Sequence, residues 1–298
     1  VVHMPAGFYR VSVPEKAGAA LSIRAGGIVL RGDGVGKTFL LNTTPQMRGR
    51  GIVSAAGPND ASWTAVKAHT PITADLLGPT TVIPVEDPSL FEVGMPVVLR
   101  TDMTEAWIRE HREEAWLPAA GTTRIGSPRY HRNVTAVDPA ARTITIDIPI
   151  RYYLKQRDNA RVYAVRADLM SEVGIEDFSI ANVQHPNLQG DFGSSSFQQE
   201  GTPGWEVHGS GAIRLTRLRD SWVRRVATFR PAENTSTSHI LSNGLLVSQC
   251  RNLTIAECHF ARPMYGGGGG NGYMYRLSGS SDVLVRDLEA EPDLAAEG

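Results

Sequence analysis

Apolar positions near the C-terminus recur in three segments of the chain. The first segment matches the second at an offset of 32 residues, and the second matches the third at an offset of 30. The matched positions are Ile213, Leu215, Leu218, Ser221, Val223 and Val226, then Leu245, Val247, Cys250, Leu253, Ile255 and Cys258, then Tyr275, Leu277, Ser280, Val283, Val285 and Leu288. Each segment predicts two short strands. A repeat of this length is typical of stacked units, each of which buries its apolar face on its neighbours.

One polar position recurs at the same phase of the repeat, just before the second strand of each unit. It is occupied by Asp220, Asn252 and Asp282. Asn and Asp side chains bond nearby backbone groups and tolerate tight corners. We therefore interpret this column as a structural ladder. The alternative is a calcium site in which Asp220 and Asp282 combine with Asp287.

The repeat divides the chain into three parts. Residues 1–50 alternate short apolar runs with Gly and Pro corners and predict the first coils of the stack. Residues 51–165 lose the repeat and predict an inserted β-rich subdomain, which includes one helix over residues 104–117 with Thr104 as its N-cap. Residues 166–298 return to the repeat. Their last rung has no covering segment, which predicts truncation at the C-terminus.

The composition agrees with an all-β chain. Lys and Arg number 30 against 31 Asp and Glu, so the net charge is −1, and the basic excess that phosphate binding needs is missing. We therefore expect no nucleic-acid partner. The 30 Gly and 18 Pro residues predict many turns, and no apolar run is long enough to span a membrane. Cys250 and Cys258 take inward phases of the repeat, which predicts two reduced core residues.

Several segments resemble right-handed parallel β-helix proteins of the pectate-lyase-like superfamily. They are PAGFYRV at 5–11, IVLRGDGVGKTFL at 28–40, and the later coils DSWVRRVATF, CRNLTIAECHF and SDVLVRDLEA. The resemblance covers about residues 1–50 and 166–291. It implies a right-handed parallel β-helix carrying an inserted subdomain, a polysaccharide partner and an extracellular location. We interpret the lack of a leader as the mark of a fragment. The superfamily includes lyases, hydrolases, epimerases and non-catalytic adhesins or tailspikes, so the fold does not settle the activity.

Two cofactor motifs fail on spacing. The segment GDGVGKT places three residues between Gly32 and Gly36, whereas a phosphate-binding loop needs four before its Gly-Lys pair. We interpret it as a tight corner between coils. The eight His residues show no paired spacing and the two Cys point inward, so no zinc site is predicted. No cofactor is expected, apart from the calcium alternative.

Arginine residues recur on the outer side of the repeat. Arg230-Pro231 and Arg262-Pro263 coincide at the offset of 32, beside outward columns that contain Arg224, Arg225 and Arg286. Matched positions on parallel strands lie about 4.8 Å apart. Guanidinium groups at that spacing suit the carboxylates of an acidic polysaccharide. The alternative is a solvated face held by ion pairs such as Arg225 with Glu257.

A group of polar residues lies beside the two Arg-Pro steps and the glycine run 266–270. We predict His259, His239 and Tyr265 as proton-transfer groups, and the substrate-binding residues Arg230, Arg262, Asn243, Tyr273 and Asn271. The glycines predict backbone that turns sharply or lies against something large, such as a sugar chain, and the plainer alternative is a loose turn.

This residue set favours a lyase that cleaves a uronate-containing glycan by β-elimination, because the reaction needs a base, an acid and cations but no carboxylate pair. A glycoside hydrolase is the second hypothesis and needs two carboxylates. Its candidates are dispersed, and they are Asp191, Glu200, Glu233 and Asp287. A non-catalytic carbohydrate-binding or tailspike-like module is the third.

Overall fold

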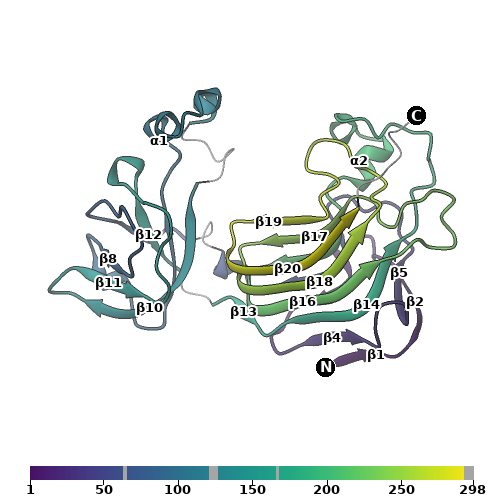
Figure 1. Cartoon of the computed structure of the whole chain (residues 1–298), viewed down its shortest axis with the longest axis horizontal. Coiled ribbons are helices and arrows are strands. Elements are labelled where there is room, and N and C mark those ends of the chain that lie inside the picture. Colours follow the sequence, from purple (N-terminus) through teal and green to yellow (C-terminus); the bar gives the residue numbers. More distant parts are fainter. Residues whose placement is uncertain (63–65, 121–126, 166–167, 292–298) are drawn as a thin grey trace. The chain divides into compact units, whose positions relative to one another are not determined.

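Figure 1 shows the computed structural model of the chain, which describes residues 1–62, 66–120, 127–165 and 168–291. The described chain is all-β with little helix, and it divides into two compact units. Unit 1 comprises Val1–Gly57, Met170–Ser278 and the described residues from Asp282 onward. Unit 2 comprises Pro58–Leu169 and the short segment Gly279–Ser281.

Unit 1 is built on parallel strands, which in the described residues form a nine-stranded and a five-stranded sheet (Figure 1). The nine-stranded sheet contains β1 (Val2–Met4), β2 (Gly7–Val11), β4 (Val29–Gly32), β5 (Thr38–Asn42), β13 (Met170–Ser171), β14 (Gly174–Asn182), β16 (Leu218–Thr228), β18 (Arg251–Ala261) and β20 (Ser281–Glu291). The five-stranded sheet contains β3 (Ala19–Ile23), β6 (Gly51–Ala56), β15 (Gly211–Thr216), β17 (Asn243–Ser248) and β19 (Tyr275–Ser278).

The register of these strands confirms the alignment of the three repeats. Ile213 pairs with Leu245, which pairs with Tyr275, and in the other sheet Val223 pairs with Ile255. The pairing is parallel in each case. Four of these side chains are fully buried, and Tyr275 packs against the same core. The apolar positions of the repeat are therefore the inward side chains that each repeat buries against the next one.

Left-handed residues form the corners of the repeat. Asp220, Asn252 and Asp282 have φ angles of 49°, 51° and 55°, and the Asn252 amide donates a hydrogen bond to the Asp220 carboxylate. A second left-handed position joins the two strands of one repeat. It is Arg217 in the first repeat and Gln249 in the second. Few residues other than Gly adopt this conformation, and Asn and Asp do so most readily. The Asp and Asn column is thus the structural ladder that the repeat predicted.

The core of unit 1 holds both cysteines. Cys250 and Cys258 are buried in the same apolar core as Phe178 and Phe260, and they form no disulfide with each other. Burial raises the pKa of each thiol to about 11. Both residues therefore act as small apolar groups, as predicted.

Unit 2 is a separate antiparallel structure with a core of its own. Its sheet has the order β7-β12-β9-β10-β11-β8 over the described residues. The strands are β7 (His69–Pro71), β8 (Val82–Pro84), β9 (Pro96–Arg100), β10 (Arg129–Asp138), β11 (Thr143–Ile146) and β12 (Arg161–Ala164). Side chains from alternating positions, among them Ile83, Leu99, Ile144 and Val162, fill the core.

Helical segments are short throughout the described chain. They are η1 (Asn59–Ala61), η2 (Pro88–Leu90), α1 (Glu105–Glu110), η3 (Glu114–Ala119), η4 (Gln156–Asp158), η5 (Ser196–Gln198) and α2 (Pro203–Val207). The Thr104 hydroxyl accepts a 3.1 Å hydrogen bond from the Trp107 amide, so Thr104 is the N-cap of α1 as predicted. None of the described helices is both long enough and apolar enough to cross a membrane.

The boundary between the units lies later than residue 50. Gly51–Ala56 forms β6, which pairs with β3 on one side and β15 on the other, so this segment belongs to the stack. The chain leaves unit 1 after Gly57 and returns at Met170. A Cβ atom added to Gly57 would lie 3.2 Å from the Met170 backbone nitrogen, so the two ends of the insertion are neighbours.

Candidate functional site

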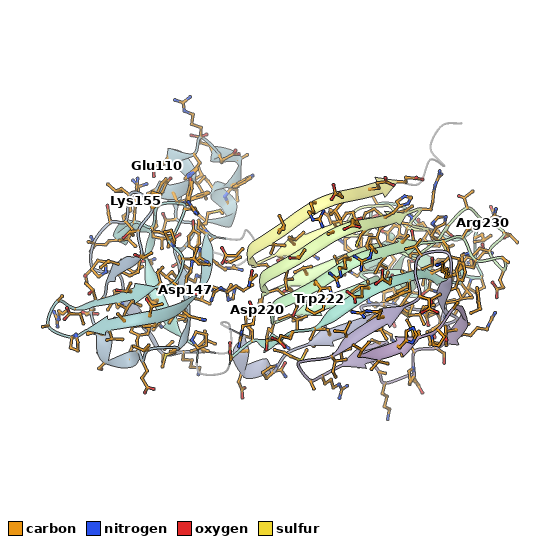
Figure 2. All side chains as sticks on the ribbon, turned by 60° about the horizontal axis from the view of Figure 1, so that its bottom comes forward. Glu110, Asp147, Lys155, Asp220, Trp222 and Arg230 are labelled. Atoms are coloured by element: carbon orange, nitrogen blue, oxygen red, sulfur yellow. The ribbon has the colours of Figure 1, made fainter. Side chains whose placement is uncertain are left out.

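Two arginine turns at the ends of β16 and β18 mark a candidate site on unit 1. β16 ends at Thr228 and β18 at Ala261, and each strand is followed closely by one of the two Arg-Pro steps. Ala227 pairs with His259 on the neighbouring strand. The loop after Arg230 returns to the same edge, where the His239 amide donates a 2.9 Å hydrogen bond to the Arg262 carbonyl oxygen. Figure 2 shows Arg230 at this end of the strands, with Asp220 at the other.

Two glutamates of β20 complete the site. The His259 ring lies 3.8 Å from Glu289 through Nδ1 and 3.2 Å from Glu291 through Nε2. Glu291 also pairs with the Arg262 guanidinium at 3.3 Å. The sequence interpretation missed both glutamates, although the offset of 30 places Glu289 beside His259. We call the six residues the His–Arg cluster, namely Arg230, His239, His259, Arg262, Glu289 and Glu291.

His239 is half-buried in this cluster. Burial lowers the pKa of its imidazole, and the nearby positive charges of Arg262, His259 and Arg230 lower it further, against an opposing effect of Glu291. Its Nδ1 lies 3.2 Å from the Thr228 hydroxyl. At neutral pH the ring is therefore uncharged, and an uncharged imidazole can accept a proton.

Arg230 is the exposed cation of the cluster. Its guanidinium donates a 3.0 Å hydrogen bond to the Asn234 carbonyl oxygen and a weaker one to Thr235. Within the described part of the chain it has no carboxylate partner, whereas Arg262 is paired with Glu291. Arg230 thus offers an uncompensated guanidinium that can bind a carboxylate of a ligand.

Tyr265 lies outside the cluster. Only 1% of its surface is exposed, and its hydroxyl donates a 2.9 Å hydrogen bond to the Gly193 carbonyl oxygen. The loop that contains Gly193 and Phe192 covers the ring. A substrate cannot reach this hydroxyl, so the structure gives Tyr265 a packing role in place of the predicted proton transfer.

The two predicted asparagines are also buried in structural contacts. The Asn243 side chain donates to the Ser210 carbonyl and accepts from the Tyr273 amide. Asn271 accepts hydrogen bonds from the Ser242 hydroxyl and the Gly209 amide. Tyr273 is 48% exposed and is the member of this group that a ligand can contact.

The glycine run packs against another part of the same chain. A Cβ atom on Gly268 would lie 2.9 Å from the Ser194 carbonyl oxygen, and one on Gly269 would lie 2.4 Å from the Phe197 ring. Gly269 also has a φ angle of 72°. The glycine run therefore lets the backbone lie against residues 194–197. The bulky neighbour that the glycines accommodate is this loop of the same chain.

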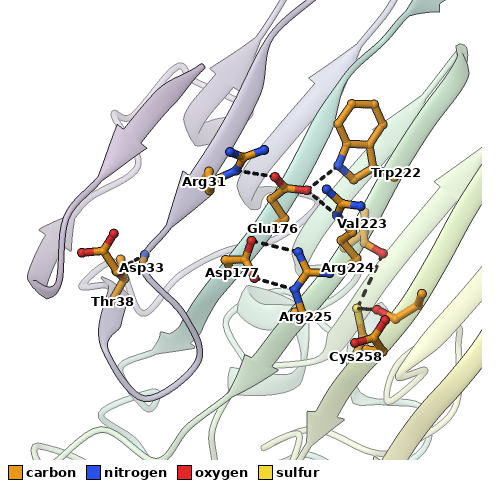
Figure 3. Close-up of polar contacts among 12 residues, drawn as sticks. Arg31, Asp33, Thr38, Glu176, Asp177, Trp222, Val223, Arg224, Arg225 and Cys258 are labelled. Carbon is orange, nitrogen blue, oxygen red and sulfur yellow. Dashed lines mark hydrogen bonds and ion pairs between the residues drawn. The ribbon is translucent and has the colours of Figure 1, made fainter.

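Ion pairs occupy the outward arginine columns. The fully buried Glu176 carboxylate accepts 2.5 Å hydrogen bonds from Arg31 and Arg224 and a 2.6 Å bond from the Trp222 indole (Figure 3). Arg225 makes two bonds to the carboxylate of Asp177. Arg286 pairs with Glu257 at 3.2 Å and Asp287 at 2.7 Å. These columns match the alternative of a solvated, ion-paired face, with Asp177 in place of Glu257 as the partner of Arg225.

The three aspartates predicted as alternative calcium ligands are each close to an arginine. Asp220 pairs with Arg219, Asp282 lies 3.7 Å from Arg251, and Asp287 pairs with Arg286. Across the described residues, no group of three or more His, Cys, Asp or Glu side chains is arranged to hold a metal ion.

We expect Glu176 to make unit 1 sensitive to acid. Burial would raise the pKa of this carboxylate, but hydrogen bonds from Arg224, Trp222 and Arg31 hold it below the usual value of 4.5. The stability that it contributes is present above the unfolded pKa and is lost as the pH falls through the lower folded value. We expect Glu176→Gln to cost about 1–3 kcal/mol at neutral pH and to flatten this acid dependence, as measured by urea unfolding at several pH values.

Glu233→Gln is the matched control for this prediction. Glu233 pairs with Arg10 through side chains that are 39% and 55% exposed. Its replacement should cost less than about 1 kcal/mol, because exposed ion pairs contribute little. Equal losses from the two variants would contradict the role given to Glu176.

Comparisons with known proteins give only distant likenesses. No protein-family model and no curated protein matches the chain. Solved structures similar to it are the tailspike gp49 from Pseudomonas phage LKA1 (13% identity, TM-score 0.44) and the gp54 tailspike of Acinetobacter baumannii bacteriophage AP22 in complex with A. baumannii capsular saccharide (11%, 0.44). The tailspike gp61 of Pseudomonas phage phi297 is another (12%, 0.42).

Each of these comparisons covers 96% of the chain but only 41%, 41% and 39% of the respective tailspike. The chain thus spans about two fifths of the length of these proteins. A likeness at this level assigns no activity to the chain, and its function has to be inferred from its own residues.

Proposed function

We propose that the stacked units form a right-handed parallel β-helix, and that the chain binds and cleaves an acidic polysaccharide at the His–Arg cluster. An extracellular location is part of the same proposal. The supporting observation is a half-buried imidazole at His239 whose pKa is lowered in part by the charge of Arg230, a guanidinium that is itself exposed and has no carboxylate partner among the described residues. A uronate carboxylate bound to Arg230 would bring the carbon beside that carboxylate toward His239.

The proposed reaction is β-elimination. His239 takes the proton from the carbon next to the uronate carboxylate, and the Arg230 guanidinium stabilises the negative charge that develops on that carboxylate. The bond from the neighbouring carbon to the glycosidic oxygen breaks, and a carbon–carbon double bond forms. His259 gives a proton to the leaving oxygen. The products are a new non-reducing end with an unsaturated uronate and a free hydroxyl on the other chain.

Hydrolysis is a second candidate because two carboxylates flank one ring of the site. Glu289 and Glu291 both lie within 4 Å of His259. A retaining or inverting glycosidase needs two such groups, one as acid and one as nucleophile or base. In this alternative, Glu291 rather than His239 would be the essential residue.

The test is incubation of the chain with a panel of acidic and neutral polysaccharides. Ultraviolet absorbance from an unsaturated uronate supports β-elimination, and new reducing ends without that absorbance support hydrolysis. Binding without either product would make the chain a carbohydrate-binding module of the tailspike-like kind. No binding to any acidic polysaccharide would overturn the proposal.

Replacing Arg230 with alanine should weaken binding of the acidic polysaccharide by about tenfold to a hundredfold, because a charge-assisted hydrogen bond contributes about 1.5–3 kcal/mol. Isothermal titration calorimetry measures this loss. The matched control is Arg286→Ala, since Arg286 is also exposed but is already paired with Glu257 and Asp287. An equal loss in both variants would indicate a general charge effect and contradict a specific role for Arg230.

A further inference from the structure

Unit 2 contains a pocket that the proposed function does not use. Its base is the pairing of β7 with β12, in which His69 lies opposite Tyr163 and Pro71 opposite Arg161. Val162, between the two β12 residues, is fully buried in the core of unit 2. Because side chains alternate along a strand, Arg161 and Tyr163 point to the other face of the sheet.

A pocket of about 550 Å³ lies on this face. Its lining includes His69, Asp102, Gln156, Asn159, Arg161 and Tyr163. Pockets that bind small molecules typically measure about 300–1,000 Å³ and combine apolar walls with a few directed polar groups. The volume and the mixed lining both fit that class.

The charged groups of the lining neutralise one another. The Asp102 carboxylate accepts hydrogen bonds from Arg161 at 2.7 Å, Arg100 at 2.9 Å and Asn159 at 3.1 Å. Burial would raise the pKa of Asp102, but the bonds from Arg161 and Asn159 hold it below its usual value. Arg161 also donates to the Tyr163 hydroxyl and the Asn159 carbonyl oxygen. The charges of Asp102 and Arg161 are therefore paired with each other, and these contacts fix the shape of the pocket wall.

Two polar side chains of the lining remain for a ligand. The Gln156 side-chain amide has no hydrogen-bond partner in the part of the chain that the structure describes, and it supplies both a donor and an acceptor. His69 Nδ1 lies 2.9 Å from the Lys67 carbonyl oxygen, so Nδ1 carries the proton and Nε2 is left as an acceptor. The His69 and Tyr163 rings lie 5.0 Å apart and form an aromatic wall.

We propose that this pocket binds an uncharged sugar residue. Its hydroxyl groups would bond to Gln156 and His69, and its apolar C–H face would lie on the aromatic wall. An anionic sugar is disfavoured, because Arg161 is already held by Asp102. This binding site goes beyond the proposed function, since all its residues belong to unit 2 and none to the His–Arg cluster.

The experiment is titration of the whole chain with uncharged oligosaccharides of glucose, galactose, mannose and their N-acetylated amines, followed by calorimetry. At least one should bind, and Gln156→Ala and His69→Ala should each weaken that binding about tenfold or more. Both side chains are exposed, so the variants should keep the circular dichroism of the parent. Gln199→Ala, an exposed glutamine of unit 1, is the matched control and should bind normally.

Three results would overturn this proposal. They are no binding of any uncharged sugar, unchanged affinity in both pocket variants, and tighter binding of the corresponding uronates in the pocket. Arg230→Ala separates the two proposals, because it should weaken binding of acidic polysaccharide and leave uncharged oligosaccharides unaffected. Failure at the His–Arg cluster would therefore not be mistaken for failure of the pocket.

Discussion

Replacing His239 with alanine should lower the rate of glycan cleavage by about 10²–10⁴-fold, which is the usual contribution of a positioned general base. The loss should appear in kcat and kcat/KM together, because the proton moves only in the transition state. Arg230 remains in this variant, so binding of the polysaccharide should change little. Initial rates of unsaturated uronate formation measure the effect, and calorimetry measures binding.

The direction in which the cleavage rate changes with pH follows from the pKa of His239. The pKa of His239 lies below the ordinary value of 6.5, so the ring becomes a competent base as the pH rises through that lower value. Activity should therefore increase on the acidic limb of the profile, and the His239→Ala residual activity should lack that limb. His3→Ala, at an exposed histidine paired with Asp33, is the control. A normal rate in His239→Ala together with an inactive Glu291→Gln would favour hydrolysis instead.

Replacing Phe178 with alanine should destabilise unit 1 by about 3–5 kcal/mol, the usual cost of removing a large aromatic side chain from a packed core. Phe178 lies on β14 and is fully buried in the core of the stack. Its surroundings are tight, because a Cβ atom added to Gly32 would lie 2.9 Å from the Phe178 Cβ atom.

Phe8→Ala is the matched variant for this measurement. Phe8 is 52% exposed on β2 and contacts the rings of Phe39 and Phe229 at 5.9 and 6.0 Å. Its loss should cost about 0.5–1.5 kcal/mol, the usual value of an aromatic pair. Urea unfolding followed by circular dichroism measures both variants. Similar losses would contradict the placement of Phe178 in the core.

The stack could be predicted because its physical cause repeats along the chain. Each inward column, such as Ile213 with Leu245, is buried and must therefore be apolar. Apolar residues consequently recur at the offset of 32 in the sequence. The corner column of Asp220, Asn252 and Asp282 followed from the same alignment, since few residues tolerate a left-handed corner.

The sequence pattern assigns β6 to the inserted subdomain because the insertion separates β6 from its partner β15 in the sequence. Gly51 pairs with Ala19 at the repeat offset of 32, but its next neighbour in the sheet is Gly211. The residues that follow Gly51 at that offset lie in unit 2 and do not continue the repeat. Spatial neighbours separated by an insertion cannot be found from spacing alone.

The positions of the candidate residues were predicted in part, and their roles stay predictions. Strand phase placed His259 and the Arg-Pro turns on one side of the stack, and the structure brings His239, Arg230 and Arg262 to the same place. The burial of Tyr265 depends on the loop at Gly193, which covers it from a distant part of the sequence. No alternation rule applies to loops, so that cover could not be read from the residues.

The neighbouring positions of Gly57 and Met170 bear on how this chain could have evolved. Gly57 donates a hydrogen bond to the Thr216 carbonyl oxygen and Met170 to that of Arg217, so the two residues occupy adjacent places at one corner of a rung. Everything between them enters and leaves through that single corner. In evolution, the inserted segment 58–169 can therefore change in length without shifting the register of the strands on either side, because both of its ends meet at that corner.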